Sequence, residues 1–161
     1  IDPVSHRYFF VQDPVEIHID KAPKQEVELD LHPDNRKGGR MFVTSTDFYL
    51  AARDVEQIKE DELIRLMECL NFRRKKKTYV FDSQEYEHYK KEGGKIVHWL
   101  PKDASNAAVE VVMPDNSVVA GLAEERVKRL KEGDIVQFER FGFVRLDNIT
   151  SNKLTFWFAH K

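Results

Sequence analysis

The densest group of side chains that could do chemistry is a run of five cations, Arg73-Arg74-Lys75-Lys76-Lys77. Consecutive cations can neutralise the phosphates of a nucleic acid and release its counterions. The same pattern is also typical of a solvated face or turn. Residues 126–131 form a second, sparser basic group. The sequence leaves both interpretations open for each group.

Residue types that often serve catalysis or metal binding are present, but they lack a supporting pattern. Cys69 has no sequence cue for a catalytic partner, and His98 lies in an alternating segment, where a histidine is more often a core or interface group. Four further side chains could hold a metal but show no recognisable ligand spacing, namely His18, Asp20, His32 and Asp34. We predict no catalytic residue, no metal and no cofactor within this chain.

Aromatic rings offer another chemistry, because a ring that stacks on an unpaired base contributes about 1–3 kcal/mol. The candidates are Trp99, Trp157, Phe141 and Phe143. We expect most of these rings to fill the core. Phe141 is the exception, because it lies between Arg140 and Gly142 at an expected hairpin tip and should be partly exposed.

The composition indicates a folded protein that binds its partners by local contacts. The 161 residues are 41% hydrophobic and include 11 Phe, whereas disordered chains are poor in such residues. A net charge of −2 argues against binding nucleic acid by bulk charge, because domains that do so are usually strongly basic. Any contact with RNA must therefore be local.

Cysteine usage and the start of the chain bear on its compartment. Cys69 is the single cysteine, so an internal disulfide is excluded and a reducing compartment, the cytoplasm, is expected. The chain opens with Ile1-Asp2-Pro3, and no apolar run approaches the ~20 residues that cross a membrane. We expect a fragment of a longer protein, without a membrane span.

Short strands dominate the expected secondary structure that must position these residues. Residues 7–11 alternate, with Tyr8 and Phe10 on one face and Phe9 and Val11 on the other. After a bend at Asp13-Pro14, further strands are expected at 15–19, 26–31, 41–43, 47–50, 78–81, 95–100, 109–113 with 118–119, and 153–159. Residues 134–147 predict a hairpin that turns at 140–142, with Gly142 at a positive φ.

Helices are fewer. A helix over about 123–131 is predicted because Ala123, Val127 and Leu130 share a face and Gly133 follows its end. A solvated helical turn is expected at 85–91. Within 60–72 the spacing of the apolar residues favours a helix by periodicity alone.

Four segments carry a resemblance to a known family. They are HRYFFVQDPVEIHI at 6–19, HPDNRKGGR at 32–40, GKIVHWLP at 94–101 and GDIVQFERFGFVRLD at 133–147. In this order they resemble the C-terminal region of class I glutamyl- and glutaminyl-tRNA synthetases, and the opening segment is similar to the archaeal glutamyl branch. The resemblance covers essentially the whole chain.

The resemblance implies an all-β fold of two antiparallel β-barrels with exchanged strands and short helices, of a type also found in a 5S RNA-binding ribosomal protein. Residues 1–60 and 122–161 would form the proximal barrel, and residues 61–121 the distal barrel. On this ground we expect residues 63–72 to be mainly strand, against their helical periodicity.

The resemblance also implies site residues. Arg7, Gln137 and Arg140 match positions that the glutaminyl relatives use to hold splayed anticodon bases. Gln offers both donors and acceptors to a base edge, and Arg offers a planar fork of donors. Without the resemblance, Arg7 would be expected in a surface ion pair, and the other two in solvent. Contacts to the tRNA backbone, or stacking, are expected from Arg73, Arg74, Lys75, Lys76, Lys77 and Phe141.

The function implied is to grip the anticodon loop of tRNA(Glu) for a glutamate-tRNA ligase. ATP and magnesium would serve a catalytic domain elsewhere in the parent chain, which would be a second partner. Acceptance of tRNA(Gln) stays open, although the acidic segment 55–62, where the glutaminyl relatives are longer and basic, suits a glutamyl enzyme. The alternative is a β-barrel scaffold or protein-interaction module that has lost tRNA binding.

Overall fold

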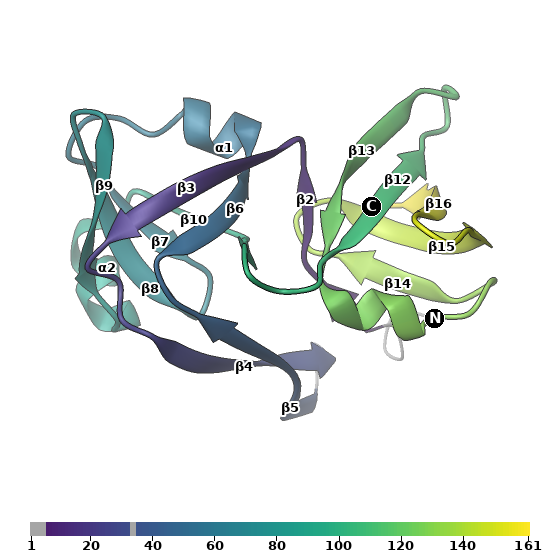
Figure 1. Cartoon of the computed structure of the whole chain (residues 1–161), viewed down its shortest axis with the longest axis horizontal. Helices are drawn as coiled ribbons and strands as arrows, with labels where there is room; N and C mark the ends of the chain where they lie inside the picture. The colour runs from purple at the N-terminus through teal and green to yellow at the C-terminus, as the bar shows by residue number, and fades with distance from the viewer. Residues whose placement is uncertain (1–5, 33–34) are drawn as a thin grey trace.

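The computed structural model describes residues 6–32 and 35–161, with the side chains of 32–38 excepted. The described residues form two lobes of curled sheet (Figure 1). The first sheet runs in the order β10-β7-β8-β9-β3-β6-β11, and the second in the order β1-β14-β15-β16-β12-β13-β2. The all-β fold expected from the resemblance is confirmed.

The first barrel is built from the middle of the chain. Its strands are β3 (Pro14–Asp20), β6 (Asp47–Ala51), β7 (Leu63–Leu66), β8 (Leu70–Lys75) and β9 (Thr78–Ser83), with β10 (Lys95–Val97) and β11 (Leu100–Pro101) at the two ends of the sheet. Because β10 and β11 belong to one continuous segment, the two ends of this sheet meet and the barrel closes.

The second barrel takes strands from both ends of the chain. It contains β12 (Ala107–Val112), β13 (Val118–Ala123), β14 (Ile135–Phe138), β15 (Gly142–Ile149) and β16 (Leu154–His160). Two consecutive strands also close this barrel, because β1 (Arg7–Tyr8) pairs with β14 and β2 (Phe10–Gln12) pairs with β13. The remaining elements are the hairpin β4 (Gln25–His32) and β5 (Asn35–Thr44), the helices α1 (Ala52–Glu56) and α2 (Tyr86–Glu92), and the 3₁₀-helix η2 (Glu125–Arg129).

The two barrels share one pattern of strand pairing. The β3–β6, β7–β8 and β8–β9 pairs are antiparallel and the β3–β9 pair is parallel. In the second barrel β12–β13, β14–β15 and β15–β16 are antiparallel and β12–β16 is parallel. The closing segments also match, because β10 pairs in parallel with β7, and β1 pairs in parallel with β14. The chain therefore contains two units of equal topology, a repeat that no sequence pattern reveals.

Each unit begins with the strand that closes the other unit's barrel. Segment 7–12 precedes the first barrel and closes the second, whereas segment 95–101 precedes the second barrel and closes the first. Both closing strands are interrupted, the one at Phe9 and the other at His98 and Trp99. These interruptions meet, since the ring centroid of Phe9 lies 6.0 Å from that of His98 and 5.4 Å from that of Trp99. The expected exchange of strands thus forms the joint between the barrels.

Alternate side chains of the first closing strand, 7–12, pack in the cores of different barrels. Phe9 and Val11 pack in the core of the first barrel, and Tyr8 and Phe10 pack in that of the second. The two-faced pattern of residues 7–11 is confirmed. A strand shared by two barrels must be apolar on both faces, because neither face meets water.

The sheet memberships differ from the predicted boundaries. Residues 14–60 lie with 61–101, and β12 and β13, within the predicted distal segment 61–121, belong to the barrel of 122–161. One barrel from both chain ends and one from the middle of the chain were expected. The boundaries between the barrels, however, fall near residue 13 and at residues 102–106. Strand pairing over long sequence separations is invisible to local patterns, which explains the shift. Which barrel is proximal stays a prediction.

Three local expectations are corrected or resolved. The predicted helix over 123–131 is a 3₁₀-helix of five residues, because Ala123 is still paired in β13. Residues 63–72 form β7 and β8, so the strand expectation is confirmed against helical periodicity. The ring of Trp157 is 45% exposed rather than in the core, whereas Trp99 is fully buried. Within the family segment at 32–40, residues 33–34 lie outside the described residues, and 35–40 belong to β5.

Candidate nucleic-acid interface

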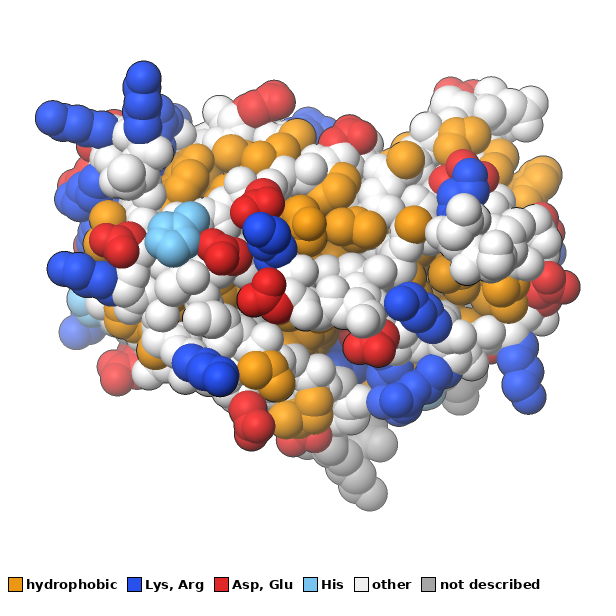
Figure 2. Space-filling view, viewed as in Figure 1, with side chains coloured by type: hydrophobic (Ala, Val, Ile, Leu, Met, Phe, Trp, Pro, Cys, Tyr) orange, Lys and Arg blue, Asp and Glu red, His pale blue; other side chains and the backbone are white. Residues whose placement is uncertain are grey.

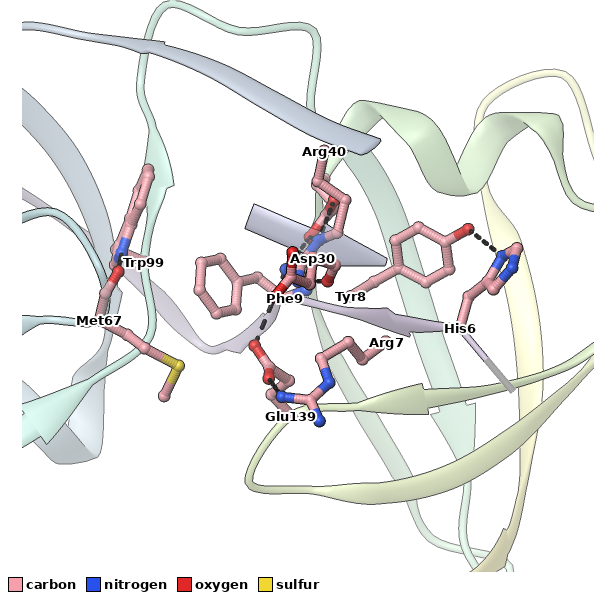
Figure 3. Close-up of polar contacts among 10 residues, drawn as sticks. His6, Arg7, Tyr8, Phe9, Asp30, Arg40, Met67, Trp99 and Glu139 are labelled. Atoms are coloured by element: carbon pink, nitrogen blue, oxygen red, sulfur yellow. Dashed lines mark hydrogen bonds and ion pairs between the residues drawn. The ribbon is translucent and has the colours of Figure 1, made fainter. Parts of the chain in front are cut away.

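Arg7 and Gln137 lie side by side on neighbouring strands of the second barrel. They are direct partners in the register of β1 and β14. Val136 and Phe138 point into the core, so Gln137 between them points away from it. Figure 3 shows Arg7 reaching Glu139, to whose Oε1 its Nη1 donates a hydrogen bond of 3.0 Å. The ion pair expected for Arg7 without the resemblance is therefore present.

A hollow of about 330 Å³ opens beside Arg7, at the joint of the two barrels. This volume is at the lower end of the range for ligand pockets, about 300–1,000 Å³. The hollow is lined by Arg7, Glu28, Leu29, Asp30, Arg40, Met67, Glu68 and Glu139. Its four acidic residues outnumber its two arginines, so the hollow disfavours a phosphate and suits a group with N–H donors. Gln137 and Arg140 do not line it.

Arg140 was expected in solvent without the resemblance, and its side chain is 39% exposed, but its guanidinium also contacts the first barrel. Arg140 adopts a left-handed conformation, with φ of 63°. Its Nη1 and Nη2 each donate a hydrogen bond of 3.0 Å to a carboxylate oxygen of Asp54, in α1 of the first barrel. Gly142 itself has φ of 146°, as predicted, and a Cβ there would lie 2.6 Å from the ring of Phe158.

His98 completes the contact between Arg140 and the first barrel. Its Nδ1 lies 3.0 Å from Nη1 of Arg140. A guanidinium only donates hydrogen bonds, so this ring nitrogen must accept, which requires a neutral imidazole. Burial, and next the positive charge of Arg140, lower the pKa of His98 to about 4. His98 lies at the interface between the barrels, as predicted, but only its Nδ1 is hydrogen-bonded, because its buried Nε2 has no partner among the described residues.

Phe141 follows Arg140 in the β14–β15 turn and is half-buried. Its ring contacts Phe10 edge-on at 5.3 Å and Phe158 at 5.8 Å between centroids. Partial exposure agrees with the expectation, but the ring is packed on the core of the second barrel. A base could reach only the part that these neighbours leave open.

The basic run lies at the turn between β8 and β9, at the end of the molecule where Figure 2 shows protruding Lys and Arg side chains. Arg73 contacts Asp82 and Glu92, and Lys75 contacts Asp61. Arg74 donates to the backbone oxygens of Ile58 and Lys76. Among the described residues, only the side chains of Lys76 and Lys77 in this run have no partner. Most of the run is therefore occupied by contacts within the first barrel, chiefly to segment 58–61 and to α2.

Sequence reasoning missed a second arginine at the joint. Arg40, on β5, is 1% exposed and donates from Nε and Nη2 to the carboxylate of Glu124, which is 3% exposed. The same carboxylate accepts a hydrogen bond of 2.6 Å from the backbone N–H of Phe9, where the closing strand is interrupted. Burial raises the pKa of Glu124, and Arg40 opposes that rise. Alternation could have revealed the pair, because Arg40 shares the inward face of β5 with Phe42.

A second and larger hollow is lined by Arg40 as well. Its volume is about 940 Å³, and it is lined by β5, the 101–106 loop and η2. None of Arg7, Gln137 and Arg140 lines it. We place the candidate interface at the smaller hollow, because that one contains a predicted base-contacting residue.

Cys69 is buried, as predicted, and burial raises the pKa of its thiol to about 11. Nδ1 of His18 lies 2.7 Å from Oδ1 of Asp47. The side chain of His32 and the whole of Asp34 lie outside the described residues. Within residues 6–32 and 35–161, no three His, Cys, Asp or Glu side chains are grouped so as to hold a metal ion. No helix in that part is long and apolar enough to cross a membrane.

Comparison with known proteins gives one consistent result. Residues 5–91 and 96–147 match two family models, each described as the anticodon-binding domain of class I tRNA synthetases (E and Q). The chain is 39% identical over 164 residues to the glutamate–tRNA ligase of Methanobrevibacter smithii, covering 100% of this chain and 29% of that protein. It is 39% identical to that of Methanopyrus kandleri and 36% identical to that of Pyrococcus furiosus, again covering 30% and 29% of their lengths. The chain therefore belongs to the anticodon-binding region of the class I tRNA synthetases for glutamate and glutamine.

Proposed function

We propose that this chain binds the anticodon loop of tRNA(Glu) and holds unstacked bases at the joint of its two barrels. The supporting observation is the pairing of Arg7 with Gln137 beside a hollow that both barrels line. Single-stranded bases are recognised on their Watson–Crick edges, which requires fixed donors and acceptors rather than diffuse positive charge. The net charge of −2 and the acidic lining agree with such local recognition.

Each predicted residue has a role in this proposal. Glu139 holds the guanidinium of Arg7 at the rim of the hollow. Gln137, which faces away from the core, supplies a donor and an acceptor. Arg140, which follows Gln137 and Glu139 in the chain, supplies a planar fork of N–H donors. The basic turn at Lys76 and Lys77 provides phosphate contacts that carry no sequence information.

Substitution of Gln137 or Arg140 by Ala tests the proposal. A lost base contact costs about 1–3 kcal/mol, roughly ten- to a hundredfold in affinity, and reduces the preference for the cognate anticodon. The measurement is binding of tRNA(Glu) and of an anticodon-altered tRNA(Glu) by the protein that carries these residues. Arg145→Ala is the matched control, because Arg145 is an exposed arginine of the same hairpin. If discrimination is unchanged in folded Gln137 and Arg140 variants, these residues do not read the anticodon. Absence of any tRNA binding by the wild-type protein would instead favour a scaffold.

The whole protein would be a glutamate–tRNA ligase, of which this chain spans about 29% of the length seen in relatives. We assign ATP, magnesium and glutamylation to the remaining part of that ligase, which would be the partner of this chain in the cytoplasm. The acidic segment 55–62 favours tRNA(Glu) over tRNA(Gln). Measured binding of both tRNAs separates a discriminating ligase from one that accepts both.

A further inference from the structure

The guanidinium of Arg140 is held by residues of the other barrel. Asp54 binds Nη1 and Nη2 together, and His98 accepts a further hydrogen bond from Nη1. Asp54 lies in α1, and His98 lies in the interruption between β10 and β11. Two separate elements of the first barrel therefore fix one side chain of the second.

These contacts occupy part of the guanidinium and leave one edge open. Arginine carries five N–H donors in a planar fork, and the Nε–H and outer Nη2–H bonds point the same way. Within residues 6–32 and 35–161, no group accepts a hydrogen bond from Nε of Arg140. The side chain of Arg140 is 39% exposed and that of Asp54 only 8%. The anchored edge is thus buried, and the Nε/Nη2 edge is the one that a ligand can reach.

Arg40 shows what such an edge binds in this protein. Its Nε and Nη2 donate to the two carboxylate oxygens of Glu124, over 2.8 to 3.2 Å. Two adjacent acceptors therefore match the edge, and a nucleobase presents the same kind of pair. Arg140 has a left-handed backbone conformation, and its side chain reaches Asp54 and His98 of the first barrel.

We propose that Asp54 and His98 are positioning residues, which present the Nε/Nη2 edge of Arg140 to two adjacent acceptors on an unstacked anticodon base. The inference rests on the proposed function and adds two residues of the first barrel to a site carried by the second. An arginine held in this way loses little rotamer freedom on binding, and its orientation selects among bases.

The test is a double-mutant cycle between Asp54→Asn and Arg140→Ala, measured as binding of cognate and anticodon-altered tRNA(Glu) by the protein that carries these residues. Asn keeps the size of Asp54 but has only one acceptor. We expect Asp54→Asn to weaken cognate binding about tenfold and to reduce discrimination. In the Arg140→Ala background, the same change should have no further effect. Equal losses in both backgrounds would mean that Asp54 acts through stability alone.

His98 provides a second route if Asp54→Asn does not fold. In His98→Asn the amide oxygen can replace the Nδ1 acceptor, whereas His98→Leu removes it. We expect discrimination to survive in the Asn variant and to fall about tenfold in the Leu variant, at similar unfolding temperatures. Equal discrimination by the two variants would overturn the proposal.

The outcomes separate this inference from the proposed function. If Arg140→Ala itself leaves discrimination unchanged, the assignment of Arg140 to a base fails, and positioning fails with it. If Arg140→Ala lowers discrimination while the Asp54 and His98 variants do not, only the positioning role is wrong. Loss of discrimination in Arg140→Ala, Asp54→Asn and His98→Leu, with discrimination kept in His98→Asn and no additivity between the Asp54 and Arg140 substitutions, supports both.

Discussion

Two arginines cross the joint between the barrels, and their surroundings differ. Arg40 is 1% exposed, its Nε and Nη2 bind Glu124, and its Nη1 donates to the backbone oxygen of Asp30. Its guanidinium also lies 4.8 Å from the ring centroid of Phe9. Arg140 is 39% exposed, and only its Nη groups are bound, by Asp54 and His98.

The comparison separates an arginine that holds the fold from one that is available to a ligand. Every edge of Arg40 is used inside the protein, and the partner of that arginine, Glu124, also binds the interrupted closing strand at Phe9. Arg140 has an anchored edge and an open edge. Lys76 and Lys77 form the other extreme, because neither side chain has a partner among the described residues. Charge alone does not mark a binding residue; unused hydrogen-bonding capacity does.

The largest effect is expected for the buried ion pair of Arg40 and Glu124. Glu124→Ala should lower the free energy of unfolding by about 3–5 kcal/mol, because it leaves the guanidinium of Arg40 buried without its partner. Urea denaturation measures the change. Replacing both residues, as Arg40→Met with Glu124→Leu, should recover much of the loss. A change below about 1 kcal/mol for Glu124→Ala would show that the buried pair does not hold the joint.

The anchored arginine predicts a pH dependence. The pKa of His98 is near 6.5 in the unfolded chain and is lowered to about 4 in the folded chain. Between these values the unfolded state binds one more proton, so this stability contribution is complete above pH 6.5 and is lost as pH falls toward 4. The loss should reach about 3 kcal/mol. The free energy of unfolding of the wild type should therefore fall by this amount relative to that of His98→Asn as pH falls from 6.5 toward 4. Parallel curves for the two proteins would contradict the buried neutral state of His98.

The smallest effect is expected for the free cations. Replacing Lys76 and Lys77 by Ala should flatten the dependence of log K on log salt for tRNA binding by about 0.7–0.9 per lost phosphate contact. Cognate and altered anticodons should be affected equally. Arg73→Ala is the contrast, because Arg73 pairs with Asp82 and Glu92, so its loss should lower the stability of the hairpin instead. A salt slope unchanged by the Lys76 and Lys77 substitutions would identify the turn as merely solvated.

Local patterns predicted what depends on near neighbours. Alternation along residues 7–11 revealed the strand with two apolar faces, and the buried state of Cys69 followed from its residue type. The turn at Gly142 and the helical turn that became α2 were also predicted, since both depend on backbone preferences of a few residues. Residues 60–72 needed the family resemblance, because apolar residues at mixed spacing fit a helix or two short strands.

The sequence by itself therefore determined the strand-rich chain, the alternation along residues 7–11 and the family motifs that single out Arg7, Gln137 and Arg140. Only the tertiary structure decided that segment 7–12 closes the second barrel, that two units share one topology, and that the open edge of Arg140 depends on Asp54 and His98. Arg140 is separated from these partners by 86 and 42 residues. Contacts over such distances are set by which barrels close and where their interruptions meet, and no local periodicity encodes that.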